Sequence, residues 1–160
     1  MMAYWLFKTE PDVFSIDDLR TRKNKTEHWD GVRNYQARNF MRDEIKLGDL
    51  VLIYHSNARP PGIAGVAEVI KEAYPDHTQF DKKSKYFDPK STKDKPRWFM
   101  VDIRFKEKFK SYISLDELKN FPQLKEMLIL RKGNRLSITP VDKKHFEFIK
   151  KHGNLSKSSI

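Results

Sequence analysis

Runs of apolar residues along the chain predict a sheet of several strands. The runs lie at residues 4–9, 50–55, 63–70, 98–109 and 135–138. The first two runs are apolar at consecutive positions, which is typical of strands covered on both faces. Gly65 lies inside the third run and predicts a bend or a close approach of two backbones. From residue 99 to 105 apolar residues alternate, as expected for a strand with one buried face.

Capping residues predict short helices between these strands. Ser15 precedes an acidic first turn, and Ser114 stands three residues before Glu117, which is the spacing of a capping box. Thr139-Pro140 has the residue types of a helix start. Helices are accordingly expected at 16–20, 35–42, 123–130 and 140–151, and a further short helix is expected between Ser114 and Pro122. The pattern predicts an α+β fold, with a mixed sheet of five to six strands surrounded by short helices. The chain is expected to form one domain over residues 3–152, followed by a disordered polar tail over residues 153–160.

The charge of the chain narrows the class of partner. Its 160 residues carry a formal net charge of +10, and 34% are charged against about a quarter in an average protein. Such a balance favours polyanions, nucleic acid first and an acidic membrane surface second. Residues 76–97 are expected to form a long hairpin or a flexible loop that is rich in basic residues. These residues are either a solvated surface or a group that attracts phosphates. These are Lys82, Lys83, Lys85, Lys90, Lys93, Lys95 and Arg97.

Several classes of site are not expected. The chain has no cysteine, which excludes disulfides and cysteine–metal sites and is compatible with a cytoplasmic location, or a nuclear one in a eukaryote. No apolar run is long enough to predict a membrane span, and no signal peptide is recognisable. The histidines are scattered, with no pair at metal-ligand spacing, and no glycine-rich phosphate loop is present. We therefore predict no metal and no cofactor.

The stretch from His28 to Phe40 fits neither a strand nor a helix until about Tyr35. Asp30-Gly31 predicts a turn, and aromatic and polar residues crowd around it. Trp29 has two interpretations here: it fills the core, or it provides a flat surface for a ligand. Two other segments bear on the choice. They are Lys8-Thr9-Glu10-Pro11 and Tyr54-His55-Ser56-Asn57.

These three segments, in this order, resemble the EVE domain, a member of the PUA-like superfamily. The resemblance covers residues 3–152. Further matching pieces are Gly48-Asp49, Gly62-Ile63-Ala64-Gly65, Tyr74-Pro75-Asp76, Tyr86-Phe87-Asp88-Pro89, Ile113-Ser114-Leu115 and Arg135-Leu136-Ser137-Ile138-Thr139-Pro140-Val141. The resemblance implies a sheet curled into a PUA-like barrel. It also implies a non-catalytic reader that takes a modified base, such as a methylated one, out of its stack into a pocket.

By this resemblance Trp29 stacks on the base, and the polar groups of Asn34 and Ser56 bond its edge. Stacking contributes about 1–3 kcal/mol for any base, and each buried methyl group adds about 0.8 kcal/mol. The implied base pocket consists of Trp29, Asn34, Tyr35, Tyr54, His55 and Ser56. The implied phosphate-binding or polar rim consists of Lys8, Thr9, Glu10, Arg33, Asn57, Arg131, Arg135 and Ser137. The expected partner is single-stranded or modified DNA or RNA, or a modified nucleoside.

Plainer interpretations exist for several of these residues. Tyr54 can be strand core, and His55 can be a structural histidine. Lys8 and Glu10 share one side of an extended segment and can form a surface ion pair, as Arg135 can with an acidic neighbour.

Two other functions remain open. One is a general RNA-binding module without preference for a modification. The other, implied by the ASCH-like relatives in the superfamily, is an amidohydrolase for acylated nucleosides that uses Lys, Thr and Glu. Here Lys8, Thr9 and Glu10 are consecutive, so Thr9 points away from the other two in a straight strand. We therefore expect no catalysis.

Overall fold

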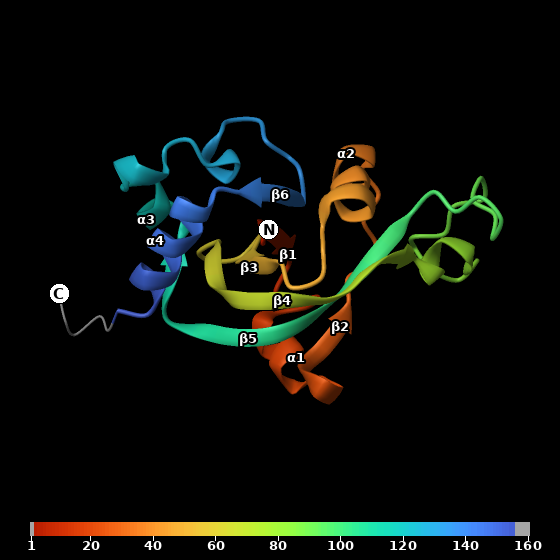
Figure 1. The fold of residues 1–160 in the computed structure, drawn as a ribbon, viewed down its shortest axis with the longest axis horizontal. Helices are drawn as coiled ribbons and strands as arrows, with labels where there is room; N and C mark the ends of the chain where they lie inside the picture. The colour runs from red at the N-terminus through yellow and green to blue at the C-terminus, as the bar shows by residue number, and fades with distance from the viewer. Residues whose placement is uncertain (1, 156–160) are drawn as a thin grey trace.

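The computed structural model describes residues 2–155, which fold around one mixed sheet of six strands (Figure 1). The strand order is β2-β5-β4-β3-β1-β6. Only β1 and β3 pair in parallel among these described neighbours. The strands are β1 (Tyr4–Thr9), β2 (Thr26–His28), β3 (Leu50–His55), β4 (Gly62–Pro75), β5 (Phe99–Ser114) and β6 (Ile138–Val141). The predicted α+β class with a mixed sheet and short helices is confirmed.

Short helices connect the strands, and the predicted N-cap at Ser15 and the predicted capping box at Ser114 are both formed. Ser15 caps α1 reciprocally with Asp18, and Ser114 caps α3 reciprocally with Glu117. The α-helices are α1 (Ile16–Thr21), α2 (Tyr35–Asn39), α3 (Leu115–Lys119) and α4 (Lys143–Gly153). A π turn, η2 (Phe40–Glu44), continues α2. The 3₁₀ turns are η1 (Lys23–Lys25), η3 (His77–Phe80), η4 (Pro122–Leu124) and η5 (Leu128–Leu130).

The sheet separates two hydrophobic cores, as the doubly apolar strands predict. Trp5 and Phe7 of β1 face a core that α1 and α2 cover, whereas Leu6 faces a core that α3 and α4 cover. All three side chains are buried. Strand alternation therefore decides which side of the molecule each residue of β1 and β3 reaches.

Strands β4 and β5 form a long hairpin that extends to one side of the molecule (Figure 1). Residues 76–98 at its far end contact the link before α2, where Asp76 and Tyr86 bond Gly31 and Arg33. The predicted close approach at Gly65 is confirmed. A Cβ atom on this residue would collide with the Glu107 carbonyl oxygen. The register of the hairpin shifts beside Gly65, which bends both strands.

Three local predictions are corrected. Residues 26–28 form a strand too short for any alternation to predict it. Thr139 and Pro140 lie in β6 rather than at a helix start, and α4 begins after Asp142. Because β6 is an edge strand, a proline without an N–H is tolerated there. Residues 123–130 form two 3₁₀ turns, not one helix.

The C-terminal end of the described chain packs on the domain. Gly153 ends α4 against the ring of Phe109, where a Cβ atom would lie 2.5 Å away. The Ser111 hydroxyl donates to the Leu155 carbonyl at 2.8 Å. Residues 153–155, expected in the polar tail, thus pack on the folded domain. Residues 156–160 lie outside the described part of the chain.

Asp49 fixes the start of the sheet. Its buried carboxylate accepts hydrogen bonds from the Trp5 indole at 3.0 Å, the Ala3 backbone at 3.0 Å and the Lys46 backbone at 2.8 Å. The carboxylate thereby ties the first residues of the chain to the turn before β3.

We expect Asp49→Ala to lower the free energy of unfolding by roughly 3 kcal/mol, because three donors near the core lose their acceptor. Urea denaturation followed by circular dichroism measures this loss. Asp94→Ala, at an exposed site, is the matched control and should leave the midpoint unchanged. Equal midpoints for the two variants would contradict this assignment.

Candidate functional site

A pocket of about 570 Å³ opens beside the end of β1, on the side of the core that contains Trp29. The link between β2 and α2 forms one wall, and the tip of the β4–β5 hairpin forms another. Its lining residues are Lys8, Thr9, Glu10, Val13, Phe14, Glu27, His28, Trp29, Asp30, Gly31, Val32, Arg33, Asn34, Lys85, Tyr86, Arg135 and Ser137.

The pocket contains much of the predicted site. Trp29 and Asn34 of the implied base pocket line it, together with most of the implied rim. Those rim residues are Lys8, Thr9, Glu10, Arg33, Arg135 and Ser137. They come from three distant parts of the chain: the end of β1, the link before α2 and the segment before β6.

Trp29 serves as both core and pocket floor. Its side chain is 8% exposed and packs on Phe7 and Phe14, with ring centroids 5.5 and 5.9 Å away. Its backbone N–H donates to the Val101 carbonyl at 2.8 Å, which fixes the residue beside β5. Trp29 is therefore a core residue, and only a small part of it is left to line the pocket.

Asp76 holds two walls of the pocket together. Its fully buried carboxylate accepts from the Gly31 backbone at 2.8 Å, the Thr78 backbone at 2.8 Å and the Arg33 guanidinium at 3.1 Å. Burial alone would raise the pKa of Asp76. The hydrogen bonds from Thr78, Gly31 and Arg33 outweigh it and hold the pKa below its usual range.

Arg33 is committed to these walls rather than open to a phosphate. Its guanidinium also donates to the Tyr86 carbonyl at 2.8 and 3.2 Å and to the Thr78 hydroxyl at 3.0 Å. The guanidinium lies 5.3 Å from the rings of both Tyr86 and Trp98. The structure thus places the implied phosphate ligand Arg33 in a positioning role.

Tyr86 is a pocket residue that the sequence analysis did not assign to the site. Its ring lies directly over Gly31, where a Cβ atom would be 2.6 Å from the ring. Gly31 has a φ of 81°, so both its backbone conformation and its neighbour favour glycine. The only signal in the sequence was the matching segment Tyr86-Phe87-Asp88-Pro89.

Three cations line the pocket without an ion-pair partner: Lys8, Lys85 and Arg135. None of them pairs with a carboxylate among the residues that the structure describes. The Lys8–Glu10 pair considered from the sequence is therefore not formed. Burial lowers the pKa of Lys8, whereas Arg135 is exposed.

Other predicted site residues lie outside this pocket. Tyr54 faces the core that α3 and α4 cover, because the adjacent residue Ile53 faces the core that α1 and α2 cover. Its burial raises the pKa of the hydroxyl. Tyr35 is 51% exposed and stacks on Trp98 with ring centroids 4.9 Å apart. Arg131 forms an ion pair with Glu126 at 3.5 Å and is not among the residues that line the pocket.

The remaining segment, His55-Ser56-Asn57, is structural. The His55 imidazole Nε2 accepts the Ile16 N–H at 3.1 Å, at the start of α1. The Ser56 N–H donates to the Thr9 carbonyl at 2.9 Å, and the Asn57 amide donates to Glu10 at 3.2 Å. His55 and Asn57 line a separate recess that also contains Tyr112. These contacts hold the loop after β1 in place, and the expectation that the segment shares a pocket with Trp29 is corrected.

The fold and the pocket define a known class of domain. A family model for the EVE domain matches residues 3–152, and the chain belongs to this family. It is 45% identical to human thymocyte nuclear protein 1 over 166 residues, covering 93% of this chain and 73% of that protein. The zebrafish protein of the same name is 46% identical over 162 residues, covering 91% of this chain and 69% of the relative.

Solved structures extend the comparison. A hypothetical protein from Leishmania major superposes with a TM-score of 0.89 at 48% identity, covering 96% of this chain and 95% of that one. The human THYN1 protein, crystallised in complex with DNA containing 5-methylcytosine, superposes with a TM-score of 0.89 at 44% identity. That match covers 96% of this chain and 99% of the human one.

The described residues contain no helix long and apolar enough to cross a membrane.

The contact of His55 with α1 predicts a pH dependence of stability. Burial lowers the pKa of His55, so the folded state resists protonation that the unfolded state accepts at a pKa of about 6.5. The free energy of unfolding should therefore fall as pH drops below about 6.5, with no contribution from this group at higher pH.

We expect His55→Gln, whose side-chain oxygen can still accept the Ile16 N–H, to remove this part of the pH dependence. Urea denaturation of both proteins at about pH 7.5 and about pH 5.5 measures it. The variant should lose less stability on acidification than the wild type. Equal losses in the two proteins would show that His55 does not carry the effect.

Proposed function

We propose that the pocket over Trp29 receives one base of a nucleic-acid strand without reacting with it, and that 5-methylcytosine in DNA is the first candidate. The observation that carries the proposal is the human relative, crystallised with DNA containing 5-methylcytosine at 44% identity over nearly the whole chain. A pocket of about 570 Å³ lies within the usual range of roughly 300–1,000 Å³ for small-ligand sites.

The lining supplies apolar surface for a base and its methyl group. Phe14, Trp29 and Tyr86 contribute aromatic rings to the pocket. Methyl burial against such a lining contributes on the order of 0.8 kcal/mol, which corresponds to a preference of about fourfold over unmodified cytosine. The pocket therefore favours a methylated base without excluding the plain one.

Polar groups at the pocket match the edge of cytosine. Asn34 uses its side-chain oxygen to cap α2 through the Ala37 N–H at 3.0 Å, which leaves its amide N–H groups to donate to a base. Glu10, which accepts from Asn57 through one carboxylate oxygen, has its other oxygen left to accept. A carboxylate accepts readily from the exocyclic amino group of cytosine.

Phosphates of the strand would meet Lys8, Lys85 and Arg135. These three basic side chains line the pocket, and Arg135 lies exposed at its edge. Removing a base from a duplex costs a few kcal/mol, so single-stranded or weakened sites should bind best.

The contacts of Thr9 support binding rather than hydrolysis. The Thr9 hydroxyl donates to the Phe14 carbonyl at 2.6 Å, and the Glu10 carboxylate accepts from Asn57. A nucleophile needs a base within hydrogen-bond reach. The Thr9 proton is directed to a main-chain oxygen instead, which disfavours an amidohydrolase that uses Lys8, Thr9 and Glu10.

We expect the protein to bind a short DNA strand with one central 5-methylcytosine about four times more tightly than the same strand with cytosine. Fluorescence anisotropy of labelled oligonucleotides at two salt concentrations measures this, with hydroxymethylated and acetylated cytosine and the RNA versions in the same panel. Product analysis of each sample should show no turnover.

Trp29→Phe, which keeps an aromatic residue in the core, should reduce the preference for the methylated base. Equal binding to every strand at both salt concentrations would overturn the reader and leave a general nucleic-acid-binding module, to which the net charge of +10 also corresponds. Hydrolysis of an acetylated base would overturn the non-catalytic assignment.

Arg135→Ala should weaken binding to methylated and plain strands alike, because a phosphate contact does not read the base. The slope of log affinity against log salt should become shallower by about 0.7 for a single strand. Lys119→Ala, an exposed cation on α3, is the control and should leave affinity and slope unchanged. A base-dependent loss in Arg135→Ala would contradict a phosphate role.

A further inference from the structure

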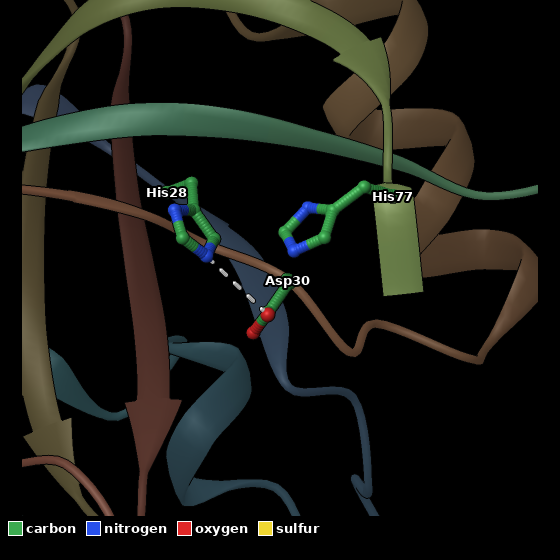
Figure 2. Close-up of side chains that lie close together, drawn as sticks. All are labelled: His28, Asp30 and His77. Carbon is green, nitrogen blue, oxygen red and sulfur yellow. Dashed lines mark ion pairs between the residues drawn. The ribbon is translucent and has the colours of Figure 1, made fainter. Parts of the chain in front are cut away.

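Two histidines and one aspartate from distant parts of the chain converge beside the pocket. Figure 2 shows the His28, Asp30 and His77 side chains directed toward one another. One ligand atom from each residue lies within 4.8 Å of those of the other two. No spacing in the sequence indicates this group, because His77 is far along the chain from His28.

The backbone around the cluster is held in place by Asp76. Its carboxylate bonds the N–H groups of Gly31 and Thr78, which flank Asp30 and His77 in the chain. Pairing of β2 with β5 places His28 opposite Asp102, close to where the hairpin leads into η3. The three side chains are therefore positioned by the fold rather than by chance proximity of a loop.

The spacing of the ligand atoms suits a tetrahedral metal ion. His28 Nε2 lies 3.5 Å from Asp30 Oδ2. Bonds of 2.0–2.1 Å to zinc in a tetrahedral arrangement separate two ligand atoms by about 3.4 Å. The rings of His28 and His77 have centroids 5.1 Å apart, and His77 is exposed, so rotation of its side chain can bring its nitrogen nearer.

An outer carboxylate already orients the imidazole of His28. Glu27 Oε1 lies 3.2 Å from His28 Nδ1 and also accepts the His28 backbone N–H at 3.1 Å. The second oxygen of Glu27 accepts from Arg22 at 3.1 Å. A carboxylate on one ring nitrogen directs the other nitrogen to a metal, as is common around metal-bound histidine.

Among the described residues, the Asp30 carboxylate has no lysine or arginine as an ion-pair partner. Glu27 pairs with Arg22, and Asp76 pairs with Arg33. Among the described residues, the only ion-pair partner of Asp30 is His28, which is charged only when it is protonated. A divalent ion would balance this carboxylate while the histidines stay neutral.

We propose that His28, Asp30 and His77 bind one divalent transition-metal ion, zinc in the first instance, with a fourth coordination position left open. Two imidazoles and one carboxylate suit zinc and similar ions better than magnesium or calcium, which prefer oxygen ligands. His28 and Asp30 lie at the β2–α2 link and His77 lies at the hairpin tip, so the ion would join these two segments. His28 and Asp30 also line the pocket. The proposal is independent of nucleic-acid binding.

The test is metal binding by the untagged full chain after treatment with a chelator. Calorimetric titration with Zn²⁺ should show one ion per chain. Co²⁺ should give the visible absorption of a four-coordinate site, and thermal unfolding should shift upward with Zn²⁺. His77→Ala changes an exposed side chain, keeps the fold, and should weaken binding by more than tenfold. Glu27→Gln should weaken it by about tenfold or more through the outer contact.

His152→Ala is the matched control. His152 lies 3.8 Å from Glu117 in another histidine–carboxylate pair, and it is not part of the cluster. This variant should bind Zn²⁺ as the wild type does. The proposal is overturned if the wild type shows no saturable binding, if His77→Ala binds equally well, or if His152→Ala loses the site.

Discussion

The buried carboxylate of Asp76 is the interaction on which the candidate site depends. It joins the glycine turn at Gly31, the guanidinium of Arg33 and the first turn of the hairpin tip. A buried carboxylate that accepts several hydrogen bonds is stable only while all its donors are in place. The two walls of the pocket are therefore coupled. The same coupling keeps His77 beside His28, so pocket shape and the proposed metal site share one structural cause.

Trp29 illustrates how one side chain can belong to the core and also line a pocket. It packs on Phe7 and Phe14 within the core, yet it also forms part of the pocket floor. A base in this pocket would contact a surface that is already packed and largely dehydrated, so little ordering would be needed on binding. The cost is that changes at Trp29 affect folding as well, which is why a conservative variant and rim variants are the more informative probes.

The basic character of the chain is not concentrated in the pocket. Lys8, Lys85 and Arg135 stand beside Glu10, Glu27 and Asp30 in its lining. A pocket of mixed charge reads polar edges rather than attracting any polyanion, whereas the net charge of +10 supports association with nucleic acid in general. In the proposed function, overall charge would attract the strand and the pocket would select the base.

Features that depend on near neighbours were readable from the sequence. Consecutive apolar residues predicted β1 and β3, and capping residues predicted α1 and α3, because such runs and helix caps are decided within a few residues. The family resemblance, which the match over residues 3–152 confirms, supplied Trp29 as a site residue.

Features that depend on contacts between distant segments could not be predicted from the sequence. Tyr54 and His55 were assigned to the pocket, although register and alternation turn Tyr54 to the other core and make His55 a cap for α1. Tyr86 and His77 reach the site only because the hairpin folds back onto Gly31 through Asp76. Such contacts form when backbone pairing has brought remote residues together, and no local pattern records them.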